Sequence, residues 1–365
     1  QGLCFALAVT GLAAQDLQVQ PGSLTCEYLT NPLGVDTHRP RFGWTLSGAR
    51  NQRQTAYEII VSDDPSALEA GSGNIWASDK VQSSEQNQIE FSGSSLSPFR
   101  KYYWKVRVYD ERGQLSAWSP TSWFETAMLK ADDWKAKWIS DGSRNPERDE
   151  DYYNNDQMPL FSREFRTPAK VSSARLYISG LGYYEAFLNG RKVGDRVFDP
   201  GWTTYRKQVL YSVYDVTDMI TPGDNVAAIM LGNGWWNPLP FKLFGRWDLR
   251  DYQQTGRPCV KAEIHIHYAD NSKEVIPTDA KWLATRGPIV KNNVYLGEHY
   301  DARLEVANWN TLKADRKIWK KAEEVAGPSG QMRVQMLPPI RVTKIVKPLT
   351  VTEHKPGVFI VDMGQ

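Results

Sequence analysis

Cysteine is scarce in this sequence, with three residues in 365, at Cys4, Cys26 and Cys259. Small domains that rely on disulfides are rich in cysteine, so this chain does not belong to that class. Cys26 and Cys259 lie far apart, in segments that we assign to different domains, and we expect no disulfide between them. A chain of this length depends on hydrophobic cores instead, and its length predicts about two to three domains.

Three further features are missing, and each argues against a class of protein. Net charge is +2, with Lys and Arg spread evenly along the chain, so we expect no nucleic-acid partner. After the first residues no segment is apolar for the ~20 residues that a membrane span needs, so we expect no span in the mature chain. Long stretches with the period of an amphipathic helix are absent, and residues 66–71 form at most one or two helical turns.

The N-terminus has the pattern of a leader. Residues 3–9 form an apolar run, and small residues follow it up to Ala13 and Ala14. This pattern is typical of the h-region and cleavage site of a secretory signal peptide, although the initiator Met and the basic n-region are lacking. We therefore predict a truncated signal-peptide remnant at residues 1–14 and an exported protein, periplasmic or on the outer cell surface. A short buried helix is the alternative.

What the sequence does have is the periodicity of β-strands along most of its length. Segments of strand length alternate apolar and polar residues or run apolar; they are 55–63, 101–110, 173–180, 184–190, 225–233, 260–270 and 357–364. Strands without intervening helices form antiparallel sandwiches. The sequence therefore predicts an all-β fold of tandem antiparallel β-sandwiches.

The first predicted sandwich spans residues 17–128. Its segment 101–110 alternates strictly, which places Trp104 on the inner face of a strand. A turn follows, and we expect Trp118 and Phe124 to return to the apolar face. Late strands of this kind resemble those of a fibronectin type III domain, a module that usually spaces or packs other domains.

A polar linker is predicted at residues 129–142, followed by a second sandwich at 143–330. Trp134 and Trp138 would be costly in a free linker, so we expect them to pack onto a neighbouring domain. Residues 331–365 are predicted to begin a further β domain.

Two local patterns mark the second sandwich. Asn189-Gly190 supplies the positive-φ pair of a tight hairpin. Residues 222–236 (PGDNVAAIMLGNGWW) have the pattern of a turn, a buried strand and a loop flanked by glycines.

Longer motifs resemble, in matching order, the N-terminal half of bacterial α-L-rhamnosidases. They lie at 31–44 (NPLGVDTHRPRFGW), 136–140 (AKWIS), 181–220, 229–236 (IMLGNGWW) and 296–305 (LGEHYDARLE). In that family a fibronectin-like domain, a jelly-roll-like sandwich and a further β domain precede a catalytic (α/α)6 barrel. The barrel hydrolyses terminal α-L-rhamnosyl residues with inversion, using two carboxylates. The resemblance implies that this chain stops before the barrel, so we assign it no catalytic residue.

The resemblance also implies a carbohydrate site, because in some members the second sandwich is a calcium-assisted L-rhamnose-binding module. Sugar recognition needs an aromatic face, amides or carboxylates for the hydroxyls, and sometimes a Ca²⁺ ion. The candidate carbohydrate-binding residues are Trp202, Asn233, Trp235, Trp236, Asp151 and Asn154. The candidate calcium ligands are Asn233, Asn237 and Pro238, and the expected partners are rhamnose-containing oligo- or polysaccharides.

These candidates have plainer interpretations. The tryptophans can pack at the rim of a core, and the Asp/Asn segment can be a solvated loop. Glu298 and Asp301 could be mistaken for a catalytic pair, and we favour instead a structural bridge from one of them to Arg303. The alternative function is a purely structural scaffold, or surface adhesion domains, without sugar binding.

Overall fold

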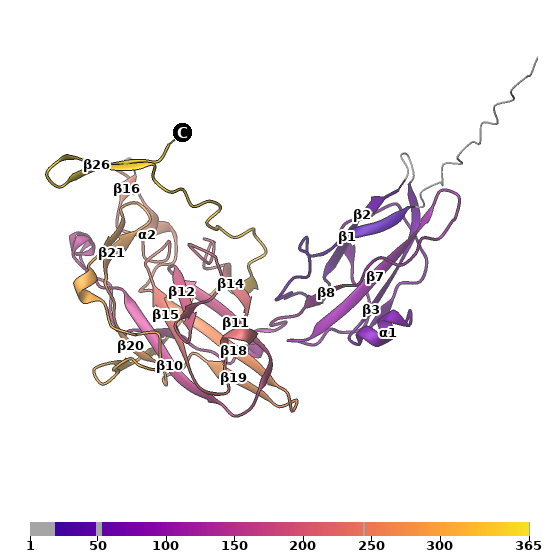
Figure 1. Cartoon of the computed structure of the whole chain (residues 1–365), viewed down its shortest axis with the longest axis horizontal. Helices are drawn as coiled ribbons and strands as arrows, with labels where there is room; N and C mark the ends of the chain where they lie inside the picture. Colours follow the sequence, from indigo (N-terminus) through magenta and orange to yellow (C-terminus); the bar gives the residue numbers. More distant parts are fainter. Residues whose placement is uncertain (1–18, 49–52, 244, 365) are drawn as a thin grey trace, which may run out of the picture. The chain divides into compact units, whose positions relative to one another are not determined.

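The computed structural model describes residues 19–48, 53–243 and 245–364, and the signal-peptide remnant predicted at 1–14 lies outside the described residues. The chain divides into two compact units, residues 1–133 and 134–365. Strands make up nearly all of the regular structure in both units (Figure 1). The predicted all-β class of tandem sandwiches is confirmed. None of the helices in the described part of the chain is long and apolar enough to cross a membrane.

The first unit is a sandwich of two antiparallel sheets. One sheet has the order β1-β2-β6, and the other has the order β4-β3-β7-β8 with β5 paired to β3. The bounds are β1 Gln20–Cys26, β2 Arg41–Ser47, β3 Gln54–Ser62, α1 Pro65–Glu69, β4 Trp76–Ala77, β5 Val81–Gln82, β6 Ile89–Glu90, β7 Lys101–Asp110, β8 Ser122–Glu125 and the 3₁₀ turn η1 Ala131–Asp133. Aromatic rings from both sheets fill the core, and the ring centroids of Phe42 and Trp104 lie 4.5 Å apart.

Strand β7 has the predicted alternation, because every second residue from Tyr102 to Asp110 is buried. Trp104 and Phe124 are fully buried in the core. Trp118 does not return to this face. Its ring centroid lies 4.5 Å from the guanidinium carbon of Arg107, which is on the opposite face of β7. This cation–π contact keeps the indole on the outer surface, so the prediction for Trp118 was wrong.

The second unit is a larger sandwich. A six-stranded sheet has the order β13-β12-β15-β10-β20-β23, and the other has the order β24-β9-β18-β11-β14-β25 with β19 paired to β18. The bounds are β9 Trp138–Ser140, β10 Pro159–Thr167, β11 Val171–Leu181, β12 Tyr184–Leu188, β13 Arg191–Lys192, β14 Gln208–Asp215, β15 Gly223–Leu231, β18 Cys259–Tyr268, β19 Lys273–Pro277, β20 Leu283–Arg286, β23 Lys320–Lys321, β24 Glu323–Val325 and β25 Gln331–Val334. The pairings are antiparallel, except that β25 runs parallel to β14.

Apolar side chains from the two sheets form the core of this unit. Phe161 and Ile229 come from the six-stranded sheet, and Ile178 and Ile264 come from the seven-stranded sheet. Short elements lie outside the sheets: β16 Lys242–Leu243, β17 Trp247–Asp248, α2 Leu249–Tyr252, β21 Ile289–Asn293, β22 Gly297–Tyr300, β26 Thr350–Lys355, β27 Val358–Asp362 and the 3₁₀ turns η2 Asp149–Tyr153, η3 Thr217–Met219 and η4 Ala302–Leu304. These elements and the loops around them supply the polar and aromatic groups described below.

The second unit extends beyond the predicted span of 143–330 at both ends. Strand β9, inside the predicted linker, pairs with β18 and β24. Trp138, the first residue of β9, is buried. The ring centroid of Trp134 lies 5.2 Å from the ring centroid of Tyr211. Both tryptophans therefore pack within the second unit. At the other end β25 joins β14, and β26 and β27 form a separate hairpin.

The local turn chemistry of the second unit follows the sequence. Residues Asn189 and Gly190 have φ angles of 51° and 82° and connect β12 to β13 in a two-residue hairpin. At Gly182 (φ +106°) a Cβ atom would lie 1.9 Å from the carbonyl oxygen of Gly232. Only glycine allows this close approach, which packs the β11–β12 connection against the loop after β15.

The first testable prediction concerns Trp138. The substitution Trp138→Ala should lower the free energy of unfolding of the second unit by about 3–5 kcal/mol, because it leaves a cavity beside Leu181 and Tyr205. Chemical denaturation measures the effect. Ile318→Ala is the control, because Ile318 is 85% exposed and its loss should change stability by less than about 0.5 kcal/mol. Equal stability of the two variants would contradict the assignment of Trp138 to the core.

Candidate functional site

Two tryptophans that are distant in sequence stack on each other in the second unit. The indole rings of Trp202 and Trp235 lie 4.5 Å apart at an interplanar angle of 14°. Tyr295, in the β21–β22 turn, packs edge-on against Trp235 at 5.9 Å, and Phe241 lies 5.6 Å from Tyr295. These four residues, here called the aromatic cluster, come from three loops. Trp202 is 48% exposed, so the stack presents aromatic surface to solvent.

Gln253, the residue after α2, fixes the stack through both ends of its amide. Its Oε1 accepts a hydrogen bond from Trp202 Nε1 at 3.1 Å, and its Nε2 donates to the carbonyl oxygen of Trp235 at 2.5 Å. Gln253 was not among the predicted site residues, because nothing near it in the sequence marks it as a partner of two distant tryptophans.

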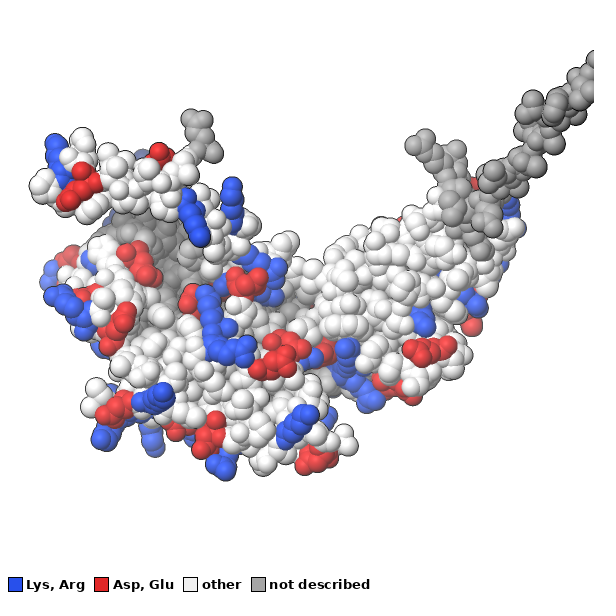
Figure 2. Space-filling model, in the orientation of Figure 1, with Lys and Arg blue, Asp and Glu red and all other residues white. Residues whose placement is uncertain are grey.

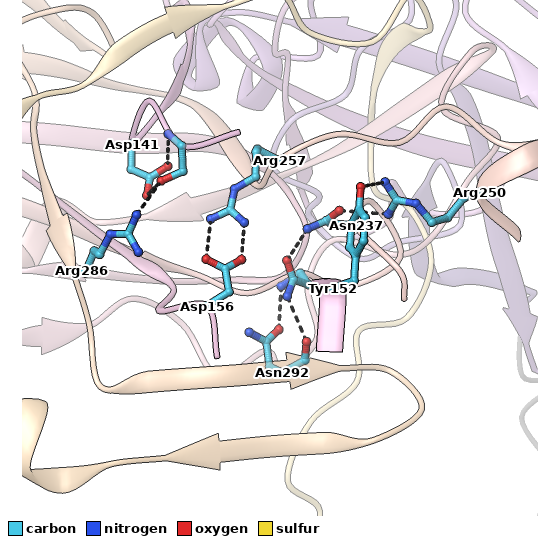
Figure 3. A network of polar contacts seen from close by, with 10 residues as sticks. Asp141, Tyr152, Asp156, Asn237, Arg250, Arg257, Arg286 and Asn292 are labelled. Carbon is cyan, nitrogen blue, oxygen red and sulfur yellow. Dashed lines mark hydrogen bonds and ion pairs between the residues drawn. The ribbon is translucent and has the colours of Figure 1, made fainter. Parts of the chain in front are cut away.

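Three asparagine side chains form a second group, with Asn233 and Asn237 on the loop after β15 and Asn292 in β21. The backbone N–H of Asn233 donates to Asn292 Oδ1 at 2.7 Å, and Asn233 Nδ2 donates to the carbonyl oxygen of Asn292 at 3.0 Å. Asn237 Nδ2 donates to Asn233 Oδ1 at 2.8 Å. Figure 3 shows this chain of amides leading from Asn292 to Asn237. Asn292, at the end of β21, was also missed.

The three predicted calcium ligands lie together, and their oxygens already have partners. Asn237 Oδ1 and the carbonyl oxygen of Pro238 accept hydrogen bonds from Arg250 Nη1, and Asn233 Oδ1 accepts from Asn237. Among residues 19–48, 53–243 and 245–364 no group of three or more His, Cys, Asp or Glu side chains could hold a metal ion. A calcium ion needs six to eight oxygens, usually with carboxylates. The residues in this arrangement therefore do not fit one.

Trp236 differs from its neighbour Trp235. It is 4% exposed, packs edge-on against Tyr205 and donates through Nε1 to the carbonyl oxygen of Arg257 at 2.8 Å. The structure places Trp236 in the core instead of on a sugar-facing surface. The plainer interpretation holds for this ring.

Asp151 and Asn154 contact each other. Asn154 Nδ2 donates to Asp151 Oδ1 at 3.3 Å. Their neighbours in and beside η2 attach the segment to the loop after β15. Tyr152 OH accepts from Arg250 Nη2 at 2.7 Å, and Tyr153 OH donates to the carbonyl oxygen of Pro240 at 2.9 Å. The sequence indicated the right segment, but the contacts are made by its tyrosines.

A buried carboxylate lies three residues before Trp202. Asp199 Oδ2 accepts from Tyr184 OH at 2.5 Å, from Ser212 Oγ at 2.5 Å and from Tyr214 OH at 3.2 Å. Its Oδ1 accepts from Gln335 Nε2 at 2.9 Å. Burial, together with the negative charge of Asp199, raises the pKa of the Tyr184 hydroxyl well above its usual value. The tyrosines therefore stay neutral donors, and the carboxylate is fully coordinated.

The loop that follows Asp199 is tied to the same network. Gln335 Oε1 accepts from the backbone N–H of Gly201 at 2.6 Å. One amide thus contacts both Asp199 and the residue before Trp202, and it fixes the backbone that carries the indole.

Charges of both signs are mixed on one face of the molecule. Figure 2 shows Lys and Arg interspersed with Asp and Glu on the face in view, without a large area of one sign.

Comparison with known proteins agrees with this fold. A family model described as "Alpha-L-rhamnosidase N-terminal domain" matches residues 169–344, and one described as "Rha78A-like, N-terminal immunoglobulin domain" matches residues 21–130. The chain belongs to the N-terminal region of the bacterial α-L-rhamnosidase family. The second model describes the first unit as an immunoglobulin domain, where the sequence indicated the related fibronectin type III sandwich.

Individual relatives match nearly the whole chain. An α-L-rhamnosidase of Formosa agariphila is 34% identical over 92% of this chain and 37% of its own length. The structure of α-L-rhamnosidase from Dictyoglumus thermophilum has a TM-score of 0.84 and 38% identity, and covers 94% of this chain and 38% of its own. The structure of a Streptomyces avermitilis α-L-rhamnosidase complexed with L-rhamnose has a TM-score of 0.83 and 26% identity, and covers 95% and 49%. The chain thus spans well under half the length of the first two relatives.

In this rhamnosidase-family chain the GEHYDAR motif forms a local ion pair. Asp301 and Arg303 are bonded at 2.6 Å, and Asp301 Oδ1 also accepts from the backbone N–H of Arg303. These bonds lower the pKa of Asp301 to about 2. The bridge that we favoured over a catalytic pair is present, and it caps η4.

The pKa of Asp301 provides the second testable prediction. Its carboxyl is bonded in the folded chain, so any stabilisation is present above the ordinary pKa of about 3.9 and is lost as the pH falls through about 2. Arg303→Gln should raise the pKa of Asp301 toward its ordinary value, as followed by NMR titration of the carboxyl carbon. Arg166→Gln, which removes the partner of Asp224, is the control and should leave Asp301 unchanged. An unchanged curve in Arg303→Gln would refute this cause.

The third prediction concerns Asp199. Asp199→Ala leaves four buried donors without their acceptor and should destabilise the second unit by roughly 3 kcal/mol or more. It should also change the fluorescence of the Trp202–Trp235 stack before unfolding begins. The control is Asp195→Ala, because Asp195 is 68% exposed and bonded to Arg341, and it should cost less than about 1 kcal/mol. Similar losses in the two variants would show that the buried network is unimportant.

Proposed function

We propose that the second unit is a carbohydrate-binding module for saccharides that end in L-rhamnose. In this proposal the module serves an exported α-L-rhamnosidase, periplasmic or on the cell surface, that hydrolyses terminal α-L-rhamnosyl residues in a catalytic domain outside this chain. One observation carries the proposal: the half-exposed Trp202 stacks on Trp235, and the loop of Trp235 also carries Asn233 and Asn237.

The chemistry of the site suits a neutral deoxy sugar. A methylpentose such as L-rhamnose has an apolar face, which packs well on a flat indole, and hydroxyls around its rim. Amides provide both donors and acceptors for such hydroxyls. The likeness to a rhamnosidase whose structure is described as complexed with L-rhamnose supports the choice of sugar.

Unpaired polar atoms in the same region favour a ligand. Gln254 Oε1, Asn292 Nδ2 and Asn293 Nδ2 are buried and have no hydrogen-bond partner. Buried polar atoms are normally bonded, and exceptions concentrate where a ligand or water completes a site. Gln254 follows Gln253, which holds the stack, and Asn292 and its neighbour Asn293 lie at the asparagine group.

A structural scaffold is the second candidate. It is favoured by the hydrogen bonds that Asn233, Asn237 and Asn292 make to one another, since these bonds leave fewer groups for a sugar. Under this alternative the loops only stabilise the sandwich.

The fourth prediction concerns binding of L-rhamnose, measured by calorimetric titration into the folded chain. We expect binding, and we expect Trp202→Ala to weaken it about tenfold, since an aromatic contact contributes roughly 1–1.5 kcal/mol. Trp247→Ala is the matched control, because Trp247 is 52% exposed and lies outside the aromatic cluster; it should keep the affinity. Absence of heat from a folded chain would favour the scaffold.

A further inference from the structure

The loop from Asn233 to Pro238 is organised around a positive charge that belongs to the chain itself. Arg250 Nη1 donates to the carbonyl oxygen of Pro238 at 2.7 Å and to Asn237 Oδ1 at 3.1 Å. Two of the three oxygens that the sequence suggested for calcium are thus bound to a guanidinium, as Figure 3 shows for Asn237.

The guanidinium also reaches the η2 segment. Nη2 donates to Tyr152 OH at 2.7 Å, and the guanidinium carbon lies 4.3 Å from the centroid of the same ring. A single side chain therefore joins the loop after β15 to the η2 segment, and Tyr152 precedes Arg250 by 98 residues. Metal ions often make cross-links of this kind between loops.

The position of Arg250 is fixed by its own helix. It is the second residue of α2, and its backbone N–H donates to Oδ1 of the buried N-cap Asp248 at 2.9 Å. Gln253, at the other end of α2, holds the Trp202–Trp235 stack. The cation and the stack are thus positioned by the same short element.

We propose that the Arg250 guanidinium takes the place of a metal ion in this site, so that the site binds its saccharide without calcium. The proposal rests on the proposed function for the choice of ligand. A calcium ion at 2.3–2.6 Å from the oxygens of Asn237 and Pro238 would lie beside a side chain that stays charged at every physiological pH. Repulsion between the two cations and the neutral character of the oxygens both disfavour the metal.

The guanidinium can also do what calcium would do for a sugar. A bound calcium ion attracts hydroxyl oxygens, and guanidinium N–H groups donate to the same oxygens. Arg has five N–H donors, and the bonds to Asn237, Pro238 and Tyr152 use three of them. Arg250 is partly exposed, so in the proposal a sugar hydroxyl uses one of the two donors outside these three bonds.

The test begins with calcium itself, added to the whole chain. Thermal unfolding and calorimetry are compared in millimolar CaCl₂ and in EDTA. We expect no calcium binding, unfolding midpoints within about 1 °C of each other, and the same L-rhamnose affinity in both buffers. Calcium binding that is lost in Asn237→Ala, or an affinity for L-rhamnose that requires calcium, would overturn the proposal.

Arginine variants complete the test. Arg250→Ala should weaken L-rhamnose binding at least tenfold in both buffers. Arg250→Lys should restore only part of the affinity, because a compact ammonium has three donors and lacks the planar fork of the guanidinium. The control is Arg246→Ala, an exposed arginine in the β16–β17 turn, which should keep the affinity. Unchanged binding in Arg250→Ala would overturn the proposal.

The outcome can be separated from that of the proposed function. If the wild-type chain binds no L-rhamnose in either buffer, the proposed function fails. The role of Arg250 is then decided by the calcium titration and by thermal unfolding. A thermal unfolding midpoint at least about 4 °C lower in Arg250→Ala than in Arg246→Ala supports the proposed role of Arg250. Equal unfolding midpoints overturn that role.

Discussion

The arrangement of the candidate site depends on one buried carboxylate. A charge inside a protein is costly unless hydrogen bonds replace its hydration, and Asp199 has four such bonds, from β12, β14 and the residue after β25. These donors are brought together only when both sheets of the second unit are complete. The loop that carries Trp202 follows directly and shares Gln335 with the carboxylate. Presentation of the aromatic ring is thereby coupled to the folding of the whole sandwich.

Sequence patterns predicted the parts of this fold that have local causes. The alternation in β7 follows from a strand with one buried face, and the Asn189-Gly190 turn follows from the φ angles that a two-residue hairpin requires. Two of the predicted site residues, Trp202 and Trp235, stack on each other, and Asn233 lies two residues before Trp235. Aromatic and amide residues in the loops of a sandwich can be recognised in a sequence, because they interrupt the alternation of the strands on either side.

The partners of those residues had no local signal. The hydrogen-bond partners of Gln253, Arg250 and Asn292 lie up to about one hundred residues away in the sequence. The residues around these three show no periodicity that would predict which way their side chains point. The same limit explains why Trp235 and Trp236 could not be told apart. In a loop without a regular period, only the tertiary structure decides which of two adjacent rings is buried. Calcium was expected from the family resemblance, and the loop offered the oxygens for it, whereas the Arg250 guanidinium that binds two of these oxygens comes from α2 and had no local signal.

The exposure of the aromatic cluster bears on the choice between a binding module and a scaffold. A ring that only stabilises a sandwich gains most when it is fully buried, yet Trp202 and Tyr295 remain 48% and 43% exposed. Gln253 uses both ends of its amide to hold the stack in this exposed position. Ordering a glutamine side chain costs conformational entropy, and an exposed apolar surface favours association with other molecules. A ligand for the indole surface would account for both costs. A purely structural role would not account for them.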